Sequence, residues 1–280
     1  MKISAALIVK NEEKYLARCL ESIKDQVDEI IIVDTGSTDK TLAIAKKYTD
    51  KVYYYKWHDD FAAARNNAFS YATGDYILSI DADEYLISKN IKDEIDGSDG
   101  IYCNLIWEGD KSTHSAPRIF KKGLKWVGKC HETIVCNTKK QSNIEIIYGH
   151  SPTHADDPER NLRILKSIKE PNARDFYYLS RESFHRKLYE DAITYADKCI
   201  EKTIWRYEKA DAYLTAARCL FYLQRGDEAR DYCLKAIMLD PEFKEALHFM
   251  GELSWEKEQK TWQRYAESAT NENAIFIRRL

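Results

Sequence analysis

Four short apolar segments separated by helical ones restrict the fold of this chain more than any other feature of its sequence. They are Ile3–Val9, Glu29–Val33, Lys51–Tyr55 and Asp75–Ile80. Segments of this length and β-rich composition are typical of strands buried on both faces of a sheet. Between the first two, Leu16, Leu20 and Ile23 share one face of a helix. The alternation of strand and helix predicts a doubly wound α/β half with a mostly parallel sheet.

Two further helices are predicted between these strands. Either Ser37 or Thr38 can cap a helix over about residues 39–48, because a hydroxyl oxygen accepts from the first free amides of a helix. A second helix runs from Phe61 to Tyr71, and Gly74 is expected in the position just past its end.

Acidic residues follow two of the predicted strands. Asp34 follows the second, and Asp81 and Asp83 follow the fourth. Ligands of open α/β sheets bind at the carboxyl ends of the strands, and Mg²⁺ or Mn²⁺ takes one or two carboxylates together with substrate phosphates. An Asp-x-Asp alone is more often an acidic turn after a strand, but its convergence with Asp34 favours a metal–diphosphate site.

Composition excludes several classes of protein. The 280 residues are 44% hydrophobic and 32% charged, with a net charge of −3, which gives no electrostatic argument for a nucleic-acid or membrane-surface partner. No apolar run reaches the ~20 residues of a membrane span, and the first residues are interpreted as a strand and not as a signal peptide. Seven cysteines without a Cys-x-x-Cys pair indicate neither a zinc ribbon nor a disulfide framework, so a cytoplasmic protein is expected.

Three motifs, in this order, resemble the signature series of the family-2 glycosyltransferases, which have the GT-A (Rossmann-like) fold. They are Leu7–Glu13, Ile32–Asp39 and Ser79–Asp83. The segment Trp57–Asn66 is similar to the corresponding segment of the bacterial and phage subgroup that includes the sublancin-type S-glycosyltransferases. The resemblance covers about residues 3–86 and implies inverting transfer from a nucleotide-diphosphate sugar, usually a UDP-sugar, with Mn²⁺ or Mg²⁺.

The same resemblance implies a set of binding residues. Those expected to contact the nucleotide are Val9, Asn11, Glu13, Asp34, Asp60, Arg65 and Asp81. The metal would be held by Asp83 and His150, with His154 as the alternative to His150. Thr35 stands where many relatives have a second acidic residue, which shifts part of base recognition to Asp60. The alternative for Asp60 is a charge favoured at a helix N-terminus.

Beyond Glu84 the chain becomes β-rich. Candidate strands are Ile101–Trp107, Pro117–Phe120, Thr133–Cys136 and Ile144–Tyr148. Between them, Trp126–Glu132 resembles the Gly-x-x-His-Glu segment of the same subgroup. Because inverting transfer needs a base for the acceptor proton, Glu132 is the candidate base, with His131 as the alternative base or orienting neighbour. In the alternative interpretation, these two side chains satisfy each other and the loop backbone.

After Ala155–Arg160 the sequence is helical and contains a repeat. Tyr213 and Ala229 repeat Phe176 and Ala192 at an offset of 37 residues, and a third copy begins with Leu247 and Gly251. The pattern resembles tetratricopeptide repeats, whose period is about 34, so a longer turn is expected around Lys202–Glu208. Stacked helix pairs of this kind present a groove or a surface for homo-oligomers.

We therefore expect a glycosyltransferase domain over residues 1–155 and an all-α, tetratricopeptide-like domain over 156–280. The acceptor would be a peptide, protein, glycan or modified DNA. In the alternative, the repeats form a peptide-binding adaptor and the first domain is inactive, which the intact set of Asp34, Asp81, Asp83 and Glu132 argues against. A nucleotidyltransferase is disfavoured because Lys10–Glu13 is not a Gly/Arg/Lys-rich phosphate loop.

Overall fold

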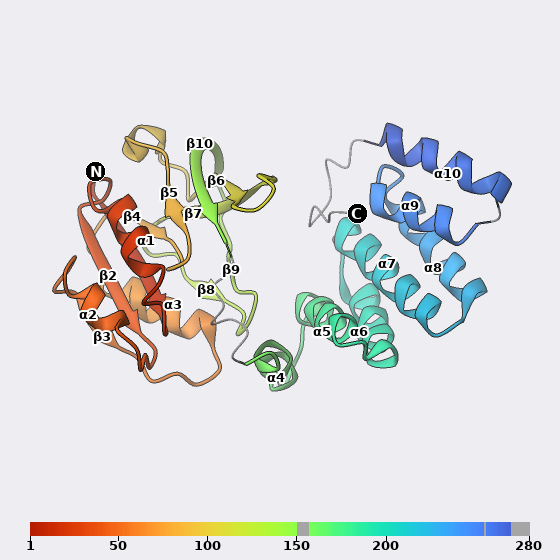
Figure 1. Ribbon diagram of the computed structural model, residues 1–280, viewed down its shortest axis with the longest axis horizontal. Helices are drawn as coiled ribbons and strands as arrows, with labels where there is room; N and C mark the ends of the chain where they lie inside the picture. Colours follow the sequence, from red (N-terminus) through yellow and green to blue (C-terminus); the bar gives the residue numbers. More distant parts are fainter. Residues whose placement is uncertain (150–156, 255, 270–280) are drawn as a thin grey trace. The chain divides into compact units, whose positions relative to one another are not determined.

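The computed structural model describes residues 1–149, 157–254 and 256–269, and it divides the chain into two compact units. The first unit is Met1–Arg160, and the second begins at Asn161. The first unit is built around a sheet and the described part of the second is helical (Figure 1). All seven cysteines are buried and free, as the sequence predicts for a chain without a disulfide framework.

Within the described residues, an eight-stranded mixed sheet has the order β3-β2-β1-β4-β7-β6-β10-β5. Its strands are β1 (Ile3–Val9), β2 (Glu29–Asp34), β3 (Val52–Tyr54), β4 (Tyr76–Ser79), β5 (Tyr85–Leu86), β6 (Gly100–Trp107), β7 (Thr113–Lys121) and β10 (Lys139–Tyr148). Strands β1 to β4 are parallel, β7 is antiparallel to both β4 and β6, and β10 is parallel to β6. The carboxyl ends of β1, β2, β4, β6 and β10 therefore lie along one edge of the sheet.

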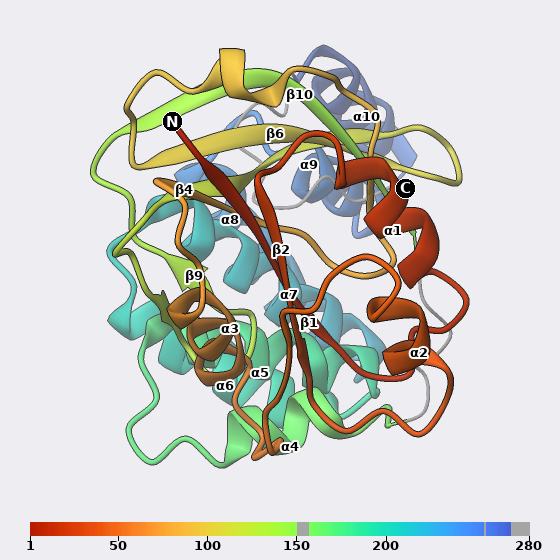
Figure 2. The same cartoon turned by 90° about the vertical axis from the view of Figure 1, so that its left-hand side faces the viewer.

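Helices cover both faces of the parallel part of this sheet. Helices α1 (Leu16–Ile23) and α2 (Thr41–Ala45) lie on one side of β1 and β2, and α3 (Phe61–Ser70) lies on the other (Figure 2). Successive strand residues point to opposite faces. Ile3 and Leu7 accordingly belong to the core beneath α1, whereas Ala6 belongs to the core beneath α3. Burial on both sides explains why the strands are almost continuously apolar.

The predicted cap of α2 is wrong. The helix is shorter than expected, and neither Ser37 nor Thr38 caps it. The Ser37 hydroxyl accepts from the Asn11 amide at 2.9 Å, and the Thr38 amide donates to Asn11 Oδ1 at 2.8 Å. Asp39 accepts from the Thr41 amide at 2.9 Å in their place. Ser37 and Thr38 therefore join the loop after β2 to the loop after β1, instead of capping α2.

The role predicted for Gly74 is also wrong. Helix α3 ends with Tyr71 as its C-cap, so Gly74 lies beyond the usual glycine position. A Cβ atom at residue 74 would lie 2.7 Å from Ser4 Oγ and 2.8 Å from the Ser4 amide nitrogen. Glycine is needed here because the chain passes close to β1 just before β4 begins.

The β-rich region contains the predicted strands with different bounds. The segment around Pro117 belongs to the longer β7, and the predicted strand from Thr133 is the short β9 (Thr133–Ile134). Strand β9 pairs with β8 (Trp126–Val127) in a separate antiparallel hairpin. Neither β5 nor β8 was expected, because two-residue strands leave no periodicity in the sequence.

The described part of the second unit contains helix hairpins that confirm the predicted repeat. Its helices are α4 (Arg160–Lys166, which begins at the unit boundary), α5 (Ala173–His185), α6 (Tyr189–Lys202), α7 (Arg206–Tyr222), α8 (Gly226–Leu239), α9 (Lys244–Glu252) and α10 (Glu256–Ser268). Small residues at equivalent positions of α6 and α8 are all fully buried: Ala192, Ala196 and Cys199, and Ala229, Cys233 and Ala236. Small side chains there let neighbouring helices approach closely.

The longer repeat offset arises in a helix and not in a turn. The connection between α6 and α7 is only Thr203–Trp205, so the expected long turn around Lys202–Glu208 is absent. Helix α7 has 17 residues whereas α5 has 13, and Tyr213 lies one turn deeper in α7 than Phe176 does in α5. Among the helices of the described residues, none has both the length and the apolar character that a membrane span requires.

Candidate active site

The loops after β1 and β2 are hydrogen-bonded to each other at the sheet edge. The Thr35 amide donates to the Val9 carbonyl at 2.9 Å, and the Thr35 hydroxyl donates to the same oxygen at 3.1 Å. Asn11, with a positive φ of 56°, is bonded to Ser37 and Thr38 as described above. The predicted donor residues Val9 and Asn11 thus hold the two loops together.

Glu13 and Asp34 add further hydrogen bonds to these two loops. The Lys40 amide donates to Glu13 Oε2 at 3.0 Å. Asp34 is 3% exposed, and its carboxylate accepts from the amides of Gly36 and Ser37 at 3.1 Å each. The Asp34 carboxylate therefore stabilises the turn that follows β2, at the edge of the sheet.

Asp60 begins α3. Its carboxylate accepts from the Ala63 amide at 2.8 Å and forms the side-chain N-cap of the helix. The structure thus shows the helix-terminal contact that the sequence left as the alternative to base recognition. A capping aspartate satisfies one of the free amides of the first turn and interacts favourably with the helix dipole.

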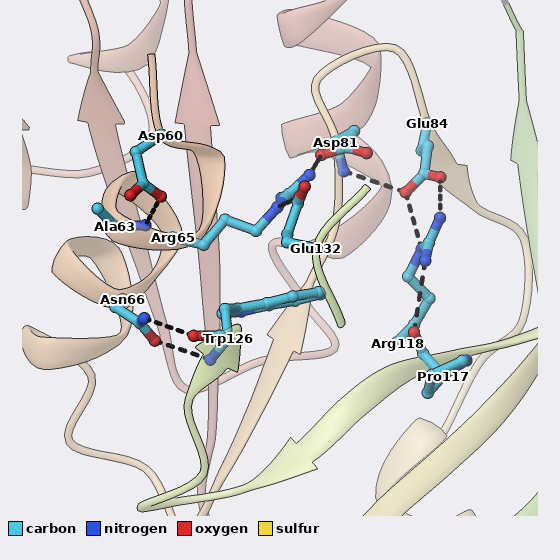
Figure 3. A network of polar contacts seen from close by, with 10 residues as sticks. All are labelled: Asp60, Ala63, Arg65, Asn66, Asp81, Glu84, Pro117, Arg118, Trp126 and Glu132. Carbon is cyan, nitrogen blue, oxygen red and sulfur yellow. Dashed lines mark hydrogen bonds and ion pairs between the residues drawn. The ribbon is translucent and has the colours of Figure 1, made fainter. Parts of the chain in front are cut away.

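Arg65 of α3 brings two predicted site residues together (Figure 3). Its Nε donates to Glu132 Oε1 at 2.5 Å, and its Nη2 donates to Asp81 Oδ1 at 2.9 Å. The Arg65 side chain is 13% exposed, and that of Glu132 is 10% exposed. Burial by itself lowers the pKa of the Arg65 guanidinium, but the Asp81 and Glu132 carboxylates outweigh it and raise the pKa above its ordinary value.

The hairpin that carries Glu132 is attached to α3 at two further points. The Asn66 amide group donates to the Trp126 carbonyl and accepts from the Trp126 amide, both at 2.9 Å (Figure 3). The Phe61 amide donates to the Lys129 carbonyl at 2.8 Å. His131 lies in the same loop, partly buried, with a φ of 53°. Helix α3 therefore sets the position of Glu132 relative to Asp81.

The Asp81–Glu84 turn is closed by its own hydrogen bonds. The Glu84 amide donates to the Asp81 carbonyl at 3.0 Å, and the Asp81 amide donates to Glu84 Oε2 at 3.0 Å. Arg118 of β7 binds both Glu84 oxygens, from Nη2 at 2.7 Å and Nε at 3.3 Å (Figure 3). Burial raises the pKa of Glu84 above its ordinary value, although Arg118 opposes this.

The sequence did not identify Glu84 and Arg118 as site residues. Glu84 directly follows the Asp-x-Asp, and Arg118 is the charged residue of the otherwise apolar segment Pro117–Phe120. Either feature is a signal for a buried ion pair, but only the pairing of β4 with β7 shows that the two side chains meet.

The carboxylates of this turn suit a hard divalent cation. Asp83 is 7% exposed and the Asp81 side chain is 39% exposed. No group of three or more His, Cys, Asp or Glu side chains suited to a metal occurs in the part of the chain that the structure describes. One or two carboxylates still fit Mg²⁺ or Mn²⁺, which completes its shell with substrate phosphates and water. The predicted ligand His150 and its alternative His154 lie outside the described residues.

The sequence of this chain is similar to the sequences of known proteins. Residues 4–147 match the family model described as glycosyl transferase family 2. The glycosyltransferase SunS of Bacillus phage SPbeta is 30% identical over 238 residues, which cover 74% of this chain and 54% of SunS. A TPR repeat-containing protein of Synechococcus elongatus is 44% identical over 110 residues, which cover 38% of this chain and 27% of that protein.

Among solved structures, S. aureus TarS 1–349 in complex with UDP matches with a TM-score of 0.46 and 17% identity, covering 98% of this chain and 89% of TarS 1–349. The present chain spans between about a quarter and about half of the length of the two curated relatives named above.

Proposed function

The chain belongs to glycosyl transferase family 2, and we propose on that basis that its first unit transfers a sugar from a nucleotide-diphosphate donor to an acceptor nucleophile. The observation that best supports this proposal is the sharing of Arg65 between Asp81 and Glu132. It joins the carboxylate-rich turn after β4 to the residue best suited to be the base. The motif resemblance favours uridine as the base of the donor.

The proposed donor site lies along the edge formed by the ends of β1, β2 and β4. Hydrogen bonds between the first two loops fix their shape before the nucleotide binds, which reduces the entropy lost on binding. Asp83, with Asp81, would hold Mn²⁺ or Mg²⁺. The cation would supply positive charge to the leaving diphosphate.

Glu132 is the proposed base. The acceptor proton passes to the Glu132 carboxylate as the acceptor oxygen or sulfur bonds to the anomeric carbon, and the bond from that carbon to the diphosphate oxygen breaks. The electron pair leaves with the nucleoside diphosphate, and a single displacement inverts the anomeric centre. The contact with Arg65 fixes the orientation of this carboxylate. His131, in the same loop, is the alternative base.

The acceptor and the setting of the reaction are also proposals. A peptide, protein, glycan or modified DNA would supply the nucleophile, and the helix hairpins of the second unit would bind that acceptor or a second copy of the chain. We place the reaction in the cytoplasm, where buried free thiols are the usual state of cysteine.

The donor class is tested by thermal unfolding of the full chain with UDP or GDP, each with and without Mn²⁺. A ligand that binds only the folded state raises its melting temperature. We expect the largest increase with UDP and Mn²⁺ together. A larger increase with GDP would contradict the uridine assignment, and no shift with any nucleotide diphosphate would favour an adaptor whose first unit is inactive.

A further inference from the structure

Arg118 lies at an irregularity of the sheet. In the pairing of β6 with β7, Ile101 is opposite Ile119 and Tyr102 is opposite Pro117, so Arg118 has no partner residue in β6. An extra residue of this kind is a β-bulge, which bends the strand and redirects a side chain. Pro117, which has no N–H to give to a ladder, is typical of such a position.

The bulge occurs where β7 separates from β4. The pairing of these strands ends at Leu78 with Ile119, and β4 itself ends at Ser79. Arg118 is therefore the first residue of β7 beyond the β4 ladder. The Asp81–Glu84 turn begins just past the end of β4. A side chain from this part of β7 can therefore reach the turn.

The hydrogen bonds from the guanidinium of Arg118 to this turn are made at Glu84. The guanidinium binds both carboxylate oxygens of Glu84, and one of them, Oε2, also accepts from the Asp81 amide. The Glu84 side chain is 5% exposed and that of Arg118 is 21% exposed. Buried, two-point pairs of this kind fix the geometry of both partners more tightly than a single contact does.

We propose that Arg118 is a positioning residue for the donor site: acting through Glu84, it fixes the backbone from which Asp81 and Asp83 face the donor diphosphate. The contact also keeps the Glu84 carboxylate turned towards β7. The link to the diphosphate rests on the proposed function, whereas the link to the Asp81 amide does not.

Loss of the guanidinium would leave the Glu84 carboxylate buried beside Asp81 and Asp83 without the charge that compensates it. Repulsion and the lost hydration then favour rotation of Glu84 towards solvent, which frees the Asp81 amide. A displacement of about 1 Å at a reacting group can cost ~10²-fold in rate.

The test compares Arg118→Met and Arg118→Lys with a matched control. Arg181→Met is that control, because Arg181 forms a buried ion pair with Asp211 at 3.3 Å within the second unit. Two quantities are measured on the full chain: hydrogen exchange of the Asp81 amide without ligand, and the UDP dissociation constant by calorimetry with and without Mn²⁺. The catalytic constants kcat and KM for a UDP-sugar complete the comparison.

We expect Arg118→Met to lose the protection of the Asp81 amide and to weaken UDP binding about 10-fold in the presence of Mn²⁺ only, with a fall in kcat of ~10²-fold. Arg118→Lys should recover part of each effect, because it restores the charge without the two-point contact. Arg181→Met should lower the melting temperature and change neither quantity.

A positioning role is overturned if Arg118→Met keeps both the Asp81 protection and the Mn²⁺-dependent UDP affinity while it melts earlier, as Arg181→Met does. If the wild-type chain binds no UDP but Arg118→Met still exposes the Asp81 amide, the proposed function is wrong and the control of the turn by Arg118 is supported. These two failures are therefore distinguishable.

Discussion

Arg65 holds the carboxylate of Glu132 through Nε at 2.5 Å while its Nη2 holds Asp81 at 2.9 Å. Asp81 follows β4, whereas Glu132 lies in the loop of the β8–β9 hairpin. One guanidinium thus fixes the distance between the turn proposed to face the donor and the proposed base. Burial strengthens the attraction between the Arg65 and Glu132 charges, because charges interact more strongly where water is excluded.

Replacement of Arg65 by methionine should cost both stability and catalysis. The variant leaves two carboxylates close together without their shared cation, for which a loss of about 3–5 kcal/mol in the free energy of unfolding is expected. Arg65→Lys should recover much of the stability but little activity, because a single ammonium cannot reproduce the two fixed hydrogen bonds. Urea unfolding measures the free energy of unfolding of both variants, and the rate of UDP release from a UDP-sugar measures their activity. Equal activity in Arg65→Met and the wild type would contradict it.

Asn66 should matter for the hairpin and not for the nucleotide. Asn66→Ala leaves the Trp126 amide and carbonyl without their partner, at a cost of about 1–3 kcal/mol in the free energy of unfolding. Sugar transfer should fall because Glu132 is displaced, whereas the UDP dissociation constant should not change. Asn67→Ala is the control, because Asn67 Oδ1 is buried without a hydrogen-bond partner. Similar effects from both variants would show that the contact with Trp126 is not the cause.

Asp83→Ala should abolish cation-dependent donor turnover while leaving the fold intact. Loss of a metal ligand removes several kcal/mol of charge stabilisation from the leaving diphosphate, hence a rate loss of roughly 10²-fold or more. The measurement is UDP release over a Mn²⁺ titration, with circular dichroism to verify folding. A folded variant that retains most of its Mn²⁺-dependent activity would remove Asp83 from the metal site.

Glu29 should make the fold sensitive to acid. Burial raises the pKa of Glu29, but hydrogen bonds from Lys51, Ser4 and Thr73 outweigh it and lower the pKa from 4.5 to about 2. Because the pKa is lower in the folded state, this stabilisation is complete above about pH 4.5 and is lost as the pH falls through 2. At neutral pH it is on the order of 3 kcal/mol for a side chain that is 10% exposed.

The check is the free energy of unfolding of Glu29→Gln and the wild type between pH 7 and pH 2. The difference between them should be largest at pH 7 and should shrink below pH 4.5. Glu21→Gln is the control, since Glu21 is exposed and forms its ion pair with the nearby Lys24. A difference that does not vary with pH would contradict an ionised, buried Glu29.

Much of the fold is predictable from local patterns in the sequence. Strands β1 and β2 are apolar along their whole length because they are buried on both faces, and the repeated small residues of α6 and α8 mark helix crossings. The misplaced cap at Ser37 and the misread Gly74 fail for one reason. Both residues serve contacts with chain segments distant in sequence, Asn11 and Ser4, which no local pattern contains.

The candidate site is predictable only in part for the same reason. The sequence identifies Asp81, Arg65 and Glu132 as site residues, but not that one guanidinium joins them. The Glu84–Arg118 pair depends on a bulge and on the register of β7 against two neighbours. Register is set by tertiary packing, so the sequence of either strand alone does not reveal it.

Release of UDP from a UDP-sugar in the presence of Mn²⁺, with water as the acceptor, tests most directly whether Glu132 is the base of a glycosyltransferase. Glu132→Gln keeps the shape of the side chain but accepts no proton, and the exposed Glu145→Gln is the control. We predict an almost unchanged UDP dissociation constant and a loss of ~10²–10⁴-fold in turnover. Undiminished turnover in Glu132→Gln, or a marked loss of UDP binding, would contradict the assignment of Glu132 as the base.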